Sequence, residues 1–141
     1  MQQQTITPKA GRDGTCLIVE DSEFDREKLR RILARAYGGM RIEFAPSIEA
    51  ARRALEGGDK ALILLDNNLP DGLGANFALE LACDDRHAET PVIMVSDWPS
   101  PFMWEKAASA GVLYVVNKSE FDARYIEAAL RQFKSRKRRV N

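Results

Sequence analysis

The segment LILLDNNLPDGLG at residues 62–74 joins an apolar run to an acidic residue and a loop. Residues 61–65 are all apolar, which is typical of a strand buried on both faces of a parallel sheet. Residues 67–74 are rich in Pro, Gly, Asn and Asp, which favour a loop. Asp66 is therefore predicted to lie directly after the carboxyl end of a buried strand.

The rest of the chain repeats this alternation of short apolar runs and longer segments with helical periodicity. Strands are predicted at residues 16–19, 40–44, 61–65, 91–95 and 112–116, and helices at residues 24–36, 46–55, 75–83, 101–110 and 122–136. Strand and helix alternating five times predict an α/β protein, a parallel sheet with helices on both faces. Ligands of such sheets bind at the carboxyl ends of the strands.

Composition excludes several classes of function. The 141 residues suit one domain, and 21 basic residues balance 21 acidic residues, so nucleic acid is an unlikely partner. The chain has no apolar segment long enough to cross a membrane and no signal peptide, and we expect a cytoplasmic protein. Cys16 and Cys83 lack metal-ligand spacing, and Cys16 is predicted to lie in the core. The single histidine, His87, is predicted to be solvated in a loop, which disfavours zinc, serine-hydrolase and histidine-kinase chemistry.

Polar residues follow four of the five predicted strands. Glu20 and Asp21 follow the first strand, Asp66 the third, Ser96-Asp97 the fourth and Asn117-Lys118 the fifth. We expect these groups to meet in one crevice. Clustered carboxylates repel one another, and a divalent cation such as Mg²⁺ relieves the repulsion. A carboxylate beside such a cation can attack phosphorus and form an aspartyl phosphate.

Several motifs resemble the receiver domains of bacterial two-component signalling. They are LIVEDS (17–22), LILLDNNLPDGLG (62–74), VIMVS (92–96) and AGVLYVVNKSEF (110–121). The intervals of 30 residues from Asp66 to Ser96 and 22 from Ser96 to Lys118 match the family. The resemblance implies a flavodoxin-like (βα)5 fold with a doubly wound five-stranded sheet in the order 2-1-3-4-5. We expect a flexible tail at residues 1–13, a receiver domain at 14–136 and a basic tail at 137–141.

The resemblance also implies roles for the residues at the strand ends. Asp66 would be the phosphoacceptor, and Mg²⁺ would be bound by Asp21 directly and by Glu20 through water. The backbone carbonyl of Asn68 would complete the metal site. Ser96 would contact the phosphoryl group, and Lys118 would pair with Asp66 and then with the phosphate.

Two positions depart from the family pattern. Receiver domains usually have proline after the conserved lysine, with a cis bond between them, whereas Ser119 follows Lys118 here. A cis bond without proline costs roughly 3–4 kcal/mol, so we predict a trans bond and a reshaped loop. The family's aromatic switch residue falls on Val115. The neighbouring Tyr114 should point to the opposite face of its strand, so the usual switch is predicted to be altered.

Two further segments leave alternatives open. Trp98, Phe102 and Trp104 follow Ser96, and they could cover the core or form a docking surface. Trp98 could instead shield an acyl phosphate from water. The basic run KSRKRR at 134–139 is interpreted as a solvated helix end, with an acidic partner or nucleic acid as the alternative.

The resulting prediction is a stand-alone receiver that is not an enzyme in the ordinary sense. A sensor histidine kinase or histidine phosphotransfer protein would donate the phosphoryl group, a downstream protein would read the output, and a homodimer is plausible. The first alternative is a receiver-like interaction module that needs no phosphorylation. The second is a small phosphohydrolase, which Asn68 disfavours because such enzymes usually have an aspartate two residues after the nucleophile.

Overall fold

A computed structural model describes residues 14–140 of the chain, with side chains described as far as residue 132. The main strands are β1 (Thr15–Val19), β2 (Arg41–Ala45), β3 (Leu62–Leu65), β6 (Val92–Ser96) and β7 (Tyr114–Asn117). The helices are α2 (Glu23–Ala36), α3 (Ile48–Glu56), α4 (Gly74–Ala82), α5 (Pro101–Ser109) and α6 (Ala123–Val140). Each predicted strand and helix is present, with ends that differ by a few residues.

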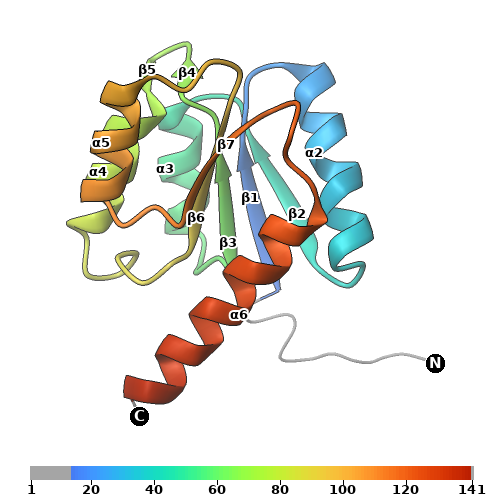
Figure 1. The fold of residues 1–141 in the computed structure, drawn as a ribbon, viewed down its shortest axis with the longest axis vertical. Coiled ribbons are helices and arrows are strands. Elements are labelled where there is room, and N and C mark those ends of the chain that lie inside the picture. The colour runs from blue at the N-terminus through green and yellow to red at the C-terminus, as the bar shows by residue number, and fades with distance from the viewer. Residues whose placement is uncertain (1–13, 141) are drawn as a thin grey trace.

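The five main strands form one parallel sheet in the order β2-β1-β3-β6-β7 (Figure 1). This is the predicted flavodoxin-like order. The segment predicted as a plain loop after Asp66 contains a small antiparallel pair, β4 (Asn68–Leu69) and β5 (Gly72–Leu73). Pairing is possible because Pro70-Asp71 reverses the chain and brings the two dipeptides side by side.

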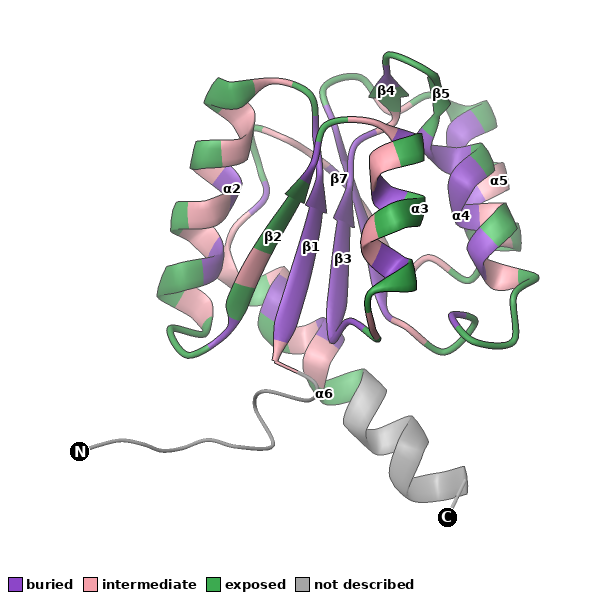
Figure 2. Ribbon diagram, turned by 180° about the vertical axis from the view of Figure 1, so that it is seen from behind, coloured by how far each residue is buried: buried purple, intermediate pink, exposed green. Residues whose placement is uncertain are grey.

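Alternating residues of the central strands supply a separate apolar layer on each face of the sheet. Leu17 and Val19 of β1 pack with α3, α4 and α5, whereas Cys16 and Ile18 pack with α2 and α6. Figure 2 shows the central strands buried between the helices, while most of β2 at the sheet edge is not. The three-layer arrangement follows from strands that are apolar on both faces.

Polar side chains determine where the helices begin. The hydroxyls of Ser22, Ser47 and Ser100 accept hydrogen bonds from backbone N–H groups in the first turns of α2, α3 and α5. Asp71 accepts two more at the start of α3, at 2.9 and 3.0 Å, and Asn67 accepts one at the start of α4. The loop after Asp66 therefore anchors two helices.

The structure corrects the prediction for His87. The side chain is buried, with 6% exposure, rather than solvated. The chain turns at this point, because the backbone N–H groups of His87 and Ala88 both donate to the carbonyl of Asp84.

The two ends of the chain bear on the predicted boundaries. Helix α6 continues to Val140, past the predicted end near residue 136. The predicted flexible tail at residues 1–13 and the basic side chains at 134–139 lie outside the described residues. Within residues 14–140, none of the helices combines the length and apolar character needed to cross a bilayer.

Candidate functional site

Three acidic side chains meet at the carboxyl end of the sheet. Glu20 and Asp21 follow β1, and Asp66 follows the neighbouring strand β3. Glu20 and Asp66 are 1% and 6% exposed, whereas Asp21 is open to solvent. One carboxylate oxygen from each lies within 4.8 Å of the other two. The predicted convergence of these residues is therefore confirmed.

Backbone hydrogen bonds continue the sheet just far enough to position these acids. The N–H of Asp66 donates to the carbonyl of Val19 at 3.0 Å, and the N–H of Glu20 donates to that of Ala45 at 3.0 Å. The Glu20 carboxylate then accepts from the N–H of Ser22 at 3.1 Å. Both acids are thus held by hydrogen bonds at the ends of the strands.

Lys118 enters the same pocket from the end of β7. The backbone N–H of Lys118 donates to the backbone carbonyl of Ser96, and this bond aligns the ends of β6 and β7. The ammonium lies 3.6 Å from Asp66 Oδ1, in agreement with the predicted pairing. It lies closer to Glu20 Oε1 at 2.9 Å, and it donates to Asp25 Oδ2 at 2.8 Å. The shortest contacts of Lys118 are therefore not with the predicted phosphoacceptor.

Asp25 is the site residue that the sequence prediction missed. It lies in the first turn of α2 and is 23% exposed at its side chain. No local signal marked it, because Glu23 and Asp25 are both acids in the first turn of α2, where acidic side chains are generally favoured. Asp25 and Lys118 are 93 positions apart along the chain, so their contact could be recognised only in the folded structure.

The acids and Lys118 perturb one another. Burial raises the pKa of Asp66 to about 6, and the charge of Glu20 adds to the effect, while Lys118 opposes it. Burial also raises the pKa of Glu20, against the opposing effect of Lys118. Burial alone would lower the pKa of Lys118, but its bonds to Asp25 and Glu20 raise that pKa overall. Lys118 contacts Glu20, Asp25 and Asp66, and Asp21 adds a fourth carboxylate, so these carboxylates outnumber the ammonium that contacts them. A bound cation would neutralise part of their charge.

A close backbone contact explains the glycine at the start of α4. A Cβ atom on Gly74 would lie 2.1 Å from the carbonyl oxygen of Asp66, closer than real Cβ contacts. The N–H of Gly74 also donates to the carbonyl of Asn67 at 2.7 Å. Only glycine lets the loop close tightly behind the acid.

Ser96 and Asn68 complete the predicted set. Ser96 is 1% exposed, and its Oγ has no hydrogen-bond partner among the described residues. Buried hydroxyls are normally paired, so this one is available to a bound group. Asn68 is exposed at the start of β4, two residues after Asp66. The role of its carbonyl as a metal ligand stays a prediction.

Comparisons with known proteins agree with this geometry. A sequence model of the response regulator receiver domain matches residues 16–131. The chain belongs to this family. A search of curated protein sequences found no match.

Solved receiver domains have the same fold. A CheY-like receiver domain protein from Methanospirillum hungatei is 21% identical, with a TM-score of 0.77 over 88% of this chain and 98% of that one. The signal receiver domain of an HD domain-containing protein from Pseudomonas fluorescens is 19% identical, with a TM-score of 0.79 over 99% of both chains. A two-component response regulator from Legionella pneumophila is 24% identical, with a TM-score of 0.73 over 86% of this chain and 98% of that one. At these identities the likeness establishes the fold.

Receiver domains typically bind Mg²⁺ in an acidic pocket, and the residues present here fit that ion. The donors are all carboxylate oxygens, which Mg²⁺ prefers, and their spacing allows one ion to contact all three acids. Glu20, Asp21 and Asp66 are the residues that would hold it.

The loop after Lys118 has the predicted trans peptide bond to Ser119. Asn117 shapes this loop of the receiver domain, because its Oδ1 accepts hydrogen bonds from both the N–H and the hydroxyl of Ser119 at 2.8 and 2.7 Å. Its Nδ2 donates to the carbonyl of Asp97, which ties the ends of β6 and β7 together. Lys28 of α2 donates to the carbonyl of Lys118 at 3.1 Å.

The two residues considered for the aromatic switch face opposite sides of β7, as predicted. Val115 packs on the side of α3, α4 and α5, whereas Tyr114 packs on the side of α2 and α6. Tyr114 makes an edge-to-face contact with Tyr125 and accepts a hydrogen bond from Gln132. An aromatic side chain is therefore absent from this position on the α5 side of the strand.

The aromatic residues after Ser96 do not cover the core of the receiver domain. Trp98, Phe102 and Trp104 are 86%, 65% and 51% exposed. Met103 and Ala107 form the buried side of α5 instead. The interpretation of the three aromatics as a core cover is wrong, and shielding of the site by Trp98 stays a prediction.

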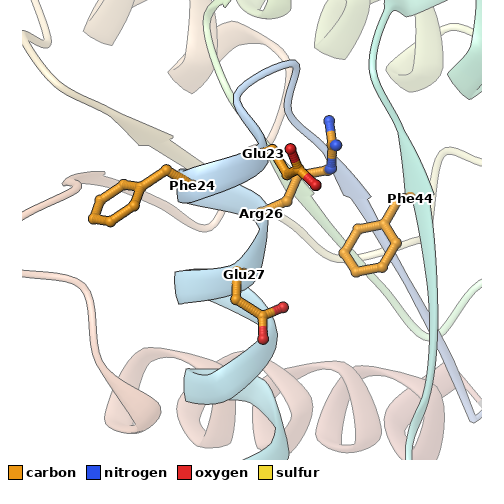
Figure 3. Close-up of a pocket in the computed structure, with 5 residues that line it drawn as sticks. All are labelled: Glu23, Phe24, Arg26, Glu27 and Phe44. Carbon is orange, nitrogen blue, oxygen red and sulfur yellow. The ribbon is translucent and has the colours of Figure 1, made fainter.

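An open pocket lies beside the acidic site, between α2 and β2 (Figure 3). It is lined by Glu23, Phe24, Arg26, Glu27 and Phe44. Arg26 joins it to the site, because its Nη1 donates to the carbonyls of Glu20 and Asp21 at 3.1 and 3.3 Å. Phe24 is 76% exposed and Phe44 44%, and Figure 3 shows their rings on opposite sides of α2.

Proposed function

We propose that this receiver domain accepts a phosphoryl group onto Asp66 from the phosphohistidine of a sensor histidine kinase or a histidine phosphotransfer protein. One Asp66 carboxylate oxygen attacks phosphorus and forms an O–P bond as the N–P bond to the donor histidine breaks. The electron pair of that bond returns to the imidazole nitrogen. The proposal follows from the carboxylate cluster beside Lys118.

The observation that carries this proposal is the spacing of charges around Asp66. The buried Asp66 carboxylate has two other acids within 4.8 Å and the Lys118 ammonium at 3.6 Å. Its raised pKa of about 6 still leaves it ionised at neutral pH, as a nucleophile must be. The ammonium is close enough to reach a phosphoryl oxygen after a small movement.

Mg²⁺ bound by Glu20, Asp21 and Asp66 would neutralise charge on the transferring group. Lys118 would supply a second positive charge on the side of β7. The Ser96 hydroxyl, which is buried without a partner among the described residues, would donate a hydrogen bond to a phosphoryl oxygen. The new bond on Ser96 is the natural start of the surface change, since β6 leads directly into the segment before α5.

The surface beside the acids supports a protein donor. Phe24 at the start of α2 and Phe44 near the end of β2 are exposed, and exposed aromatic side chains commonly anchor partners. We propose that output passes by protein contact to a downstream target, with a homodimer as one form of that contact. Cys16 and Cys83 are both free, which fits a reducing cytoplasmic setting.

Intact-protein mass spectrometry tests the proposal. The protein is incubated with acetyl phosphate and Mg²⁺, and we expect a gain of one phosphoryl group. The Asp66→Asn variant and a sample containing EDTA should show no gain. Asp97→Asn is the matched control, because Asp97 is an exposed acid at the end of β6, and it should be labelled as wild type is.

The same experiment separates the two alternatives. Absence of labelling in the wild type, or labelling that survives Asp66→Asn, would favour an interaction module that does not depend on phosphorylation. Continuous release of inorganic phosphate over many turnovers from organic phosphate esters would favour a phosphohydrolase. We do not expect the phosphohydrolase, because the position two residues after Asp66 carries Asn68, which cannot act as a general acid. The acids grouped beside Lys118 argue against the interaction module.

A further inference from the structure

We propose that Asp25 is a positioning residue that holds the Lys118 ammonium on the α2 side of the acidic pocket and so keeps Asp66 open to a divalent cation. The inference rests on the proposed function and deepens it. It assigns a role to a carboxylate outside the set that would hold Mg²⁺. Asp25 would act through Lys118 and would contact neither the cation nor the phosphoryl group.

The distances within the pocket carry the inference. The Lys118 ammonium is 2.8 Å from Asp25 and 2.9 Å from Glu20, but 3.6 Å from Asp66. An ammonium has three N–H donors in a compact head, so it moves toward the carboxylates that hold it best. Asp25 and Glu20 thus hold Lys118 away from Asp66, and Asp25 is the one of the two outside the set that would bind the cation.

Helix α2 also holds the backbone of Lys118. One turn after Asp25, the Lys28 ammonium donates to the Lys118 carbonyl at 3.1 Å. The side chain and the carbonyl of Lys118 are therefore both bound by the same face of α2. Because Lys118 is only 11% exposed at its side chain, water cannot easily replace the contact of its ammonium with Asp25.

A cation in the pocket would make the position of the Lys118 ammonium depend more strongly on Asp25. The cation would engage Glu20, Asp21 and Asp66, and their charge would then be shared with it. Asp25 would be left as the carboxylate that still attracts Lys118. Without Asp25, the ammonium would move onto Asp66 and compete with the cation for the same oxygen atoms.

Calorimetric titration of the full chain with MgCl2 tests this. We expect Asp25→Asn to weaken Mg²⁺ binding about fivefold, the size expected when two coupled charges are separated. Asp25→Glu should recover most of the loss, because a carboxylate can still reach Lys118. Glu23→Gln is the matched control, since Glu23 is an exposed acid in the same first turn of α2, and it should leave the affinity within twofold.

A crystal structure of Asp25→Asn without metal gives a readout that does not depend on Mg²⁺. We expect the Lys118 ammonium to move from 3.6 Å to direct contact with Asp66. An unmoved Lys118, or equal weakening of Mg²⁺ binding by Asp25→Asn and Glu23→Gln, would overturn the inference. The second result would mean that only the overall negative charge matters.

Failure of this inference is distinguishable from failure of the proposed function. If the wild type binds Mg²⁺ and is labelled on Asp66 while Asp25→Asn binds Mg²⁺ equally well, the positioning role alone is wrong. If the wild type neither binds Mg²⁺ nor is labelled, the proposed function is wrong. The position of Lys118 in the Asp25→Asn crystal then still decides whether Asp25 holds it.

Discussion

Replacing Asp66 by asparagine should make the metal-free protein more stable at neutral pH. Asp66 is 6% exposed, lies beside Glu20 and has a pKa of about 6 in the folded protein, against 3.8 for the ordinary side chain. An ionised carboxylate is therefore less favourable in this pocket than in the unfolded chain. The asparagine amide has nearly the same shape and no charge, so it removes that penalty.

The size and sign of the effect follow from the pKa difference. Between pH 3.8 and about 6 the folded protein holds a proton on Asp66 that the unfolded chain has lost, so stability falls as pH rises through this window. A difference of about two pKa units corresponds to about 3 kcal/mol once the pH is above 6. We expect the free energy of unfolding of Asp66→Asn to exceed that of the wild type by about 3 kcal/mol at pH 7.5 and by about 1 kcal/mol at pH 4.5.

Urea unfolding followed by circular dichroism, in EDTA at several pH values, measures this difference. Circular dichroism is preferable to fluorescence because both tryptophans are largely exposed, at 86% and 51%. Asp85→Asn is the control, since Asp85 is an exposed acid, and its stability difference from wild type should be small at each pH. Added MgCl2 should stabilise the wild type and so reduce the difference in unfolding free energy between it and Asp66→Asn.

Two results would refute this reasoning. One is an Asp66→Asn protein that is no more stable than the wild type at pH 7.5 in EDTA. The other is a difference of equal size at pH 4.5 and pH 7.5, because it would not arise from titration of the acid.

Three further substitutions test other parts of the structure. Gly74→Ala should cost at least about 2 kcal/mol in urea unfolding and reduce labelling of Asp66, because its Cβ would lie 2.1 Å from the Asp66 carbonyl oxygen; wild-type stability would contradict the close packing. Asp71→Ala should cost about 1 kcal/mol through loss of its two bonds at the start of α3, with labelling retained; an unchanged unfolding midpoint would argue against this cap. Trp98→Ala should change stability by less than about 0.5 kcal/mol because the ring is 86% exposed, and a larger loss would indicate packing that the structure lacks.

Much of the fold was predictable because its signals are local. Residues 61–65 are uniformly apolar, and the structure buries the strand that they contain on both faces. The strand–helix alternation predicted a parallel sheet, and parallel strands bring their carboxyl ends together. For that reason the convergence of Glu20, Asp21, Asp66 and Lys118 could be predicted without coordinates.

Other features depended on contacts that no local pattern reports. His87 was predicted to be solvated because its neighbours are polar, but the folded chain buries its side chain. Trp98 and Phe102 are apolar and yet exposed, because Met103 and Ala107 form the buried face of α5. Periodicity identifies a buried face only after the helix has been oriented against its sheet.

The order of residues along the chain determined the kind of protein, namely a parallel α/β receiver domain with acids and a lysine at its strand ends. Tertiary structure alone decided which carboxylates the ammonium of that lysine contacts most closely. Lys118 lies closest to Asp25, on a helix 93 positions earlier, and farther from Asp66. The physical reason is that strand ends are set by backbone pairing, which sequence patterns report, whereas the partner of a long side chain is set by the distances and charges of groups that only folding brings together.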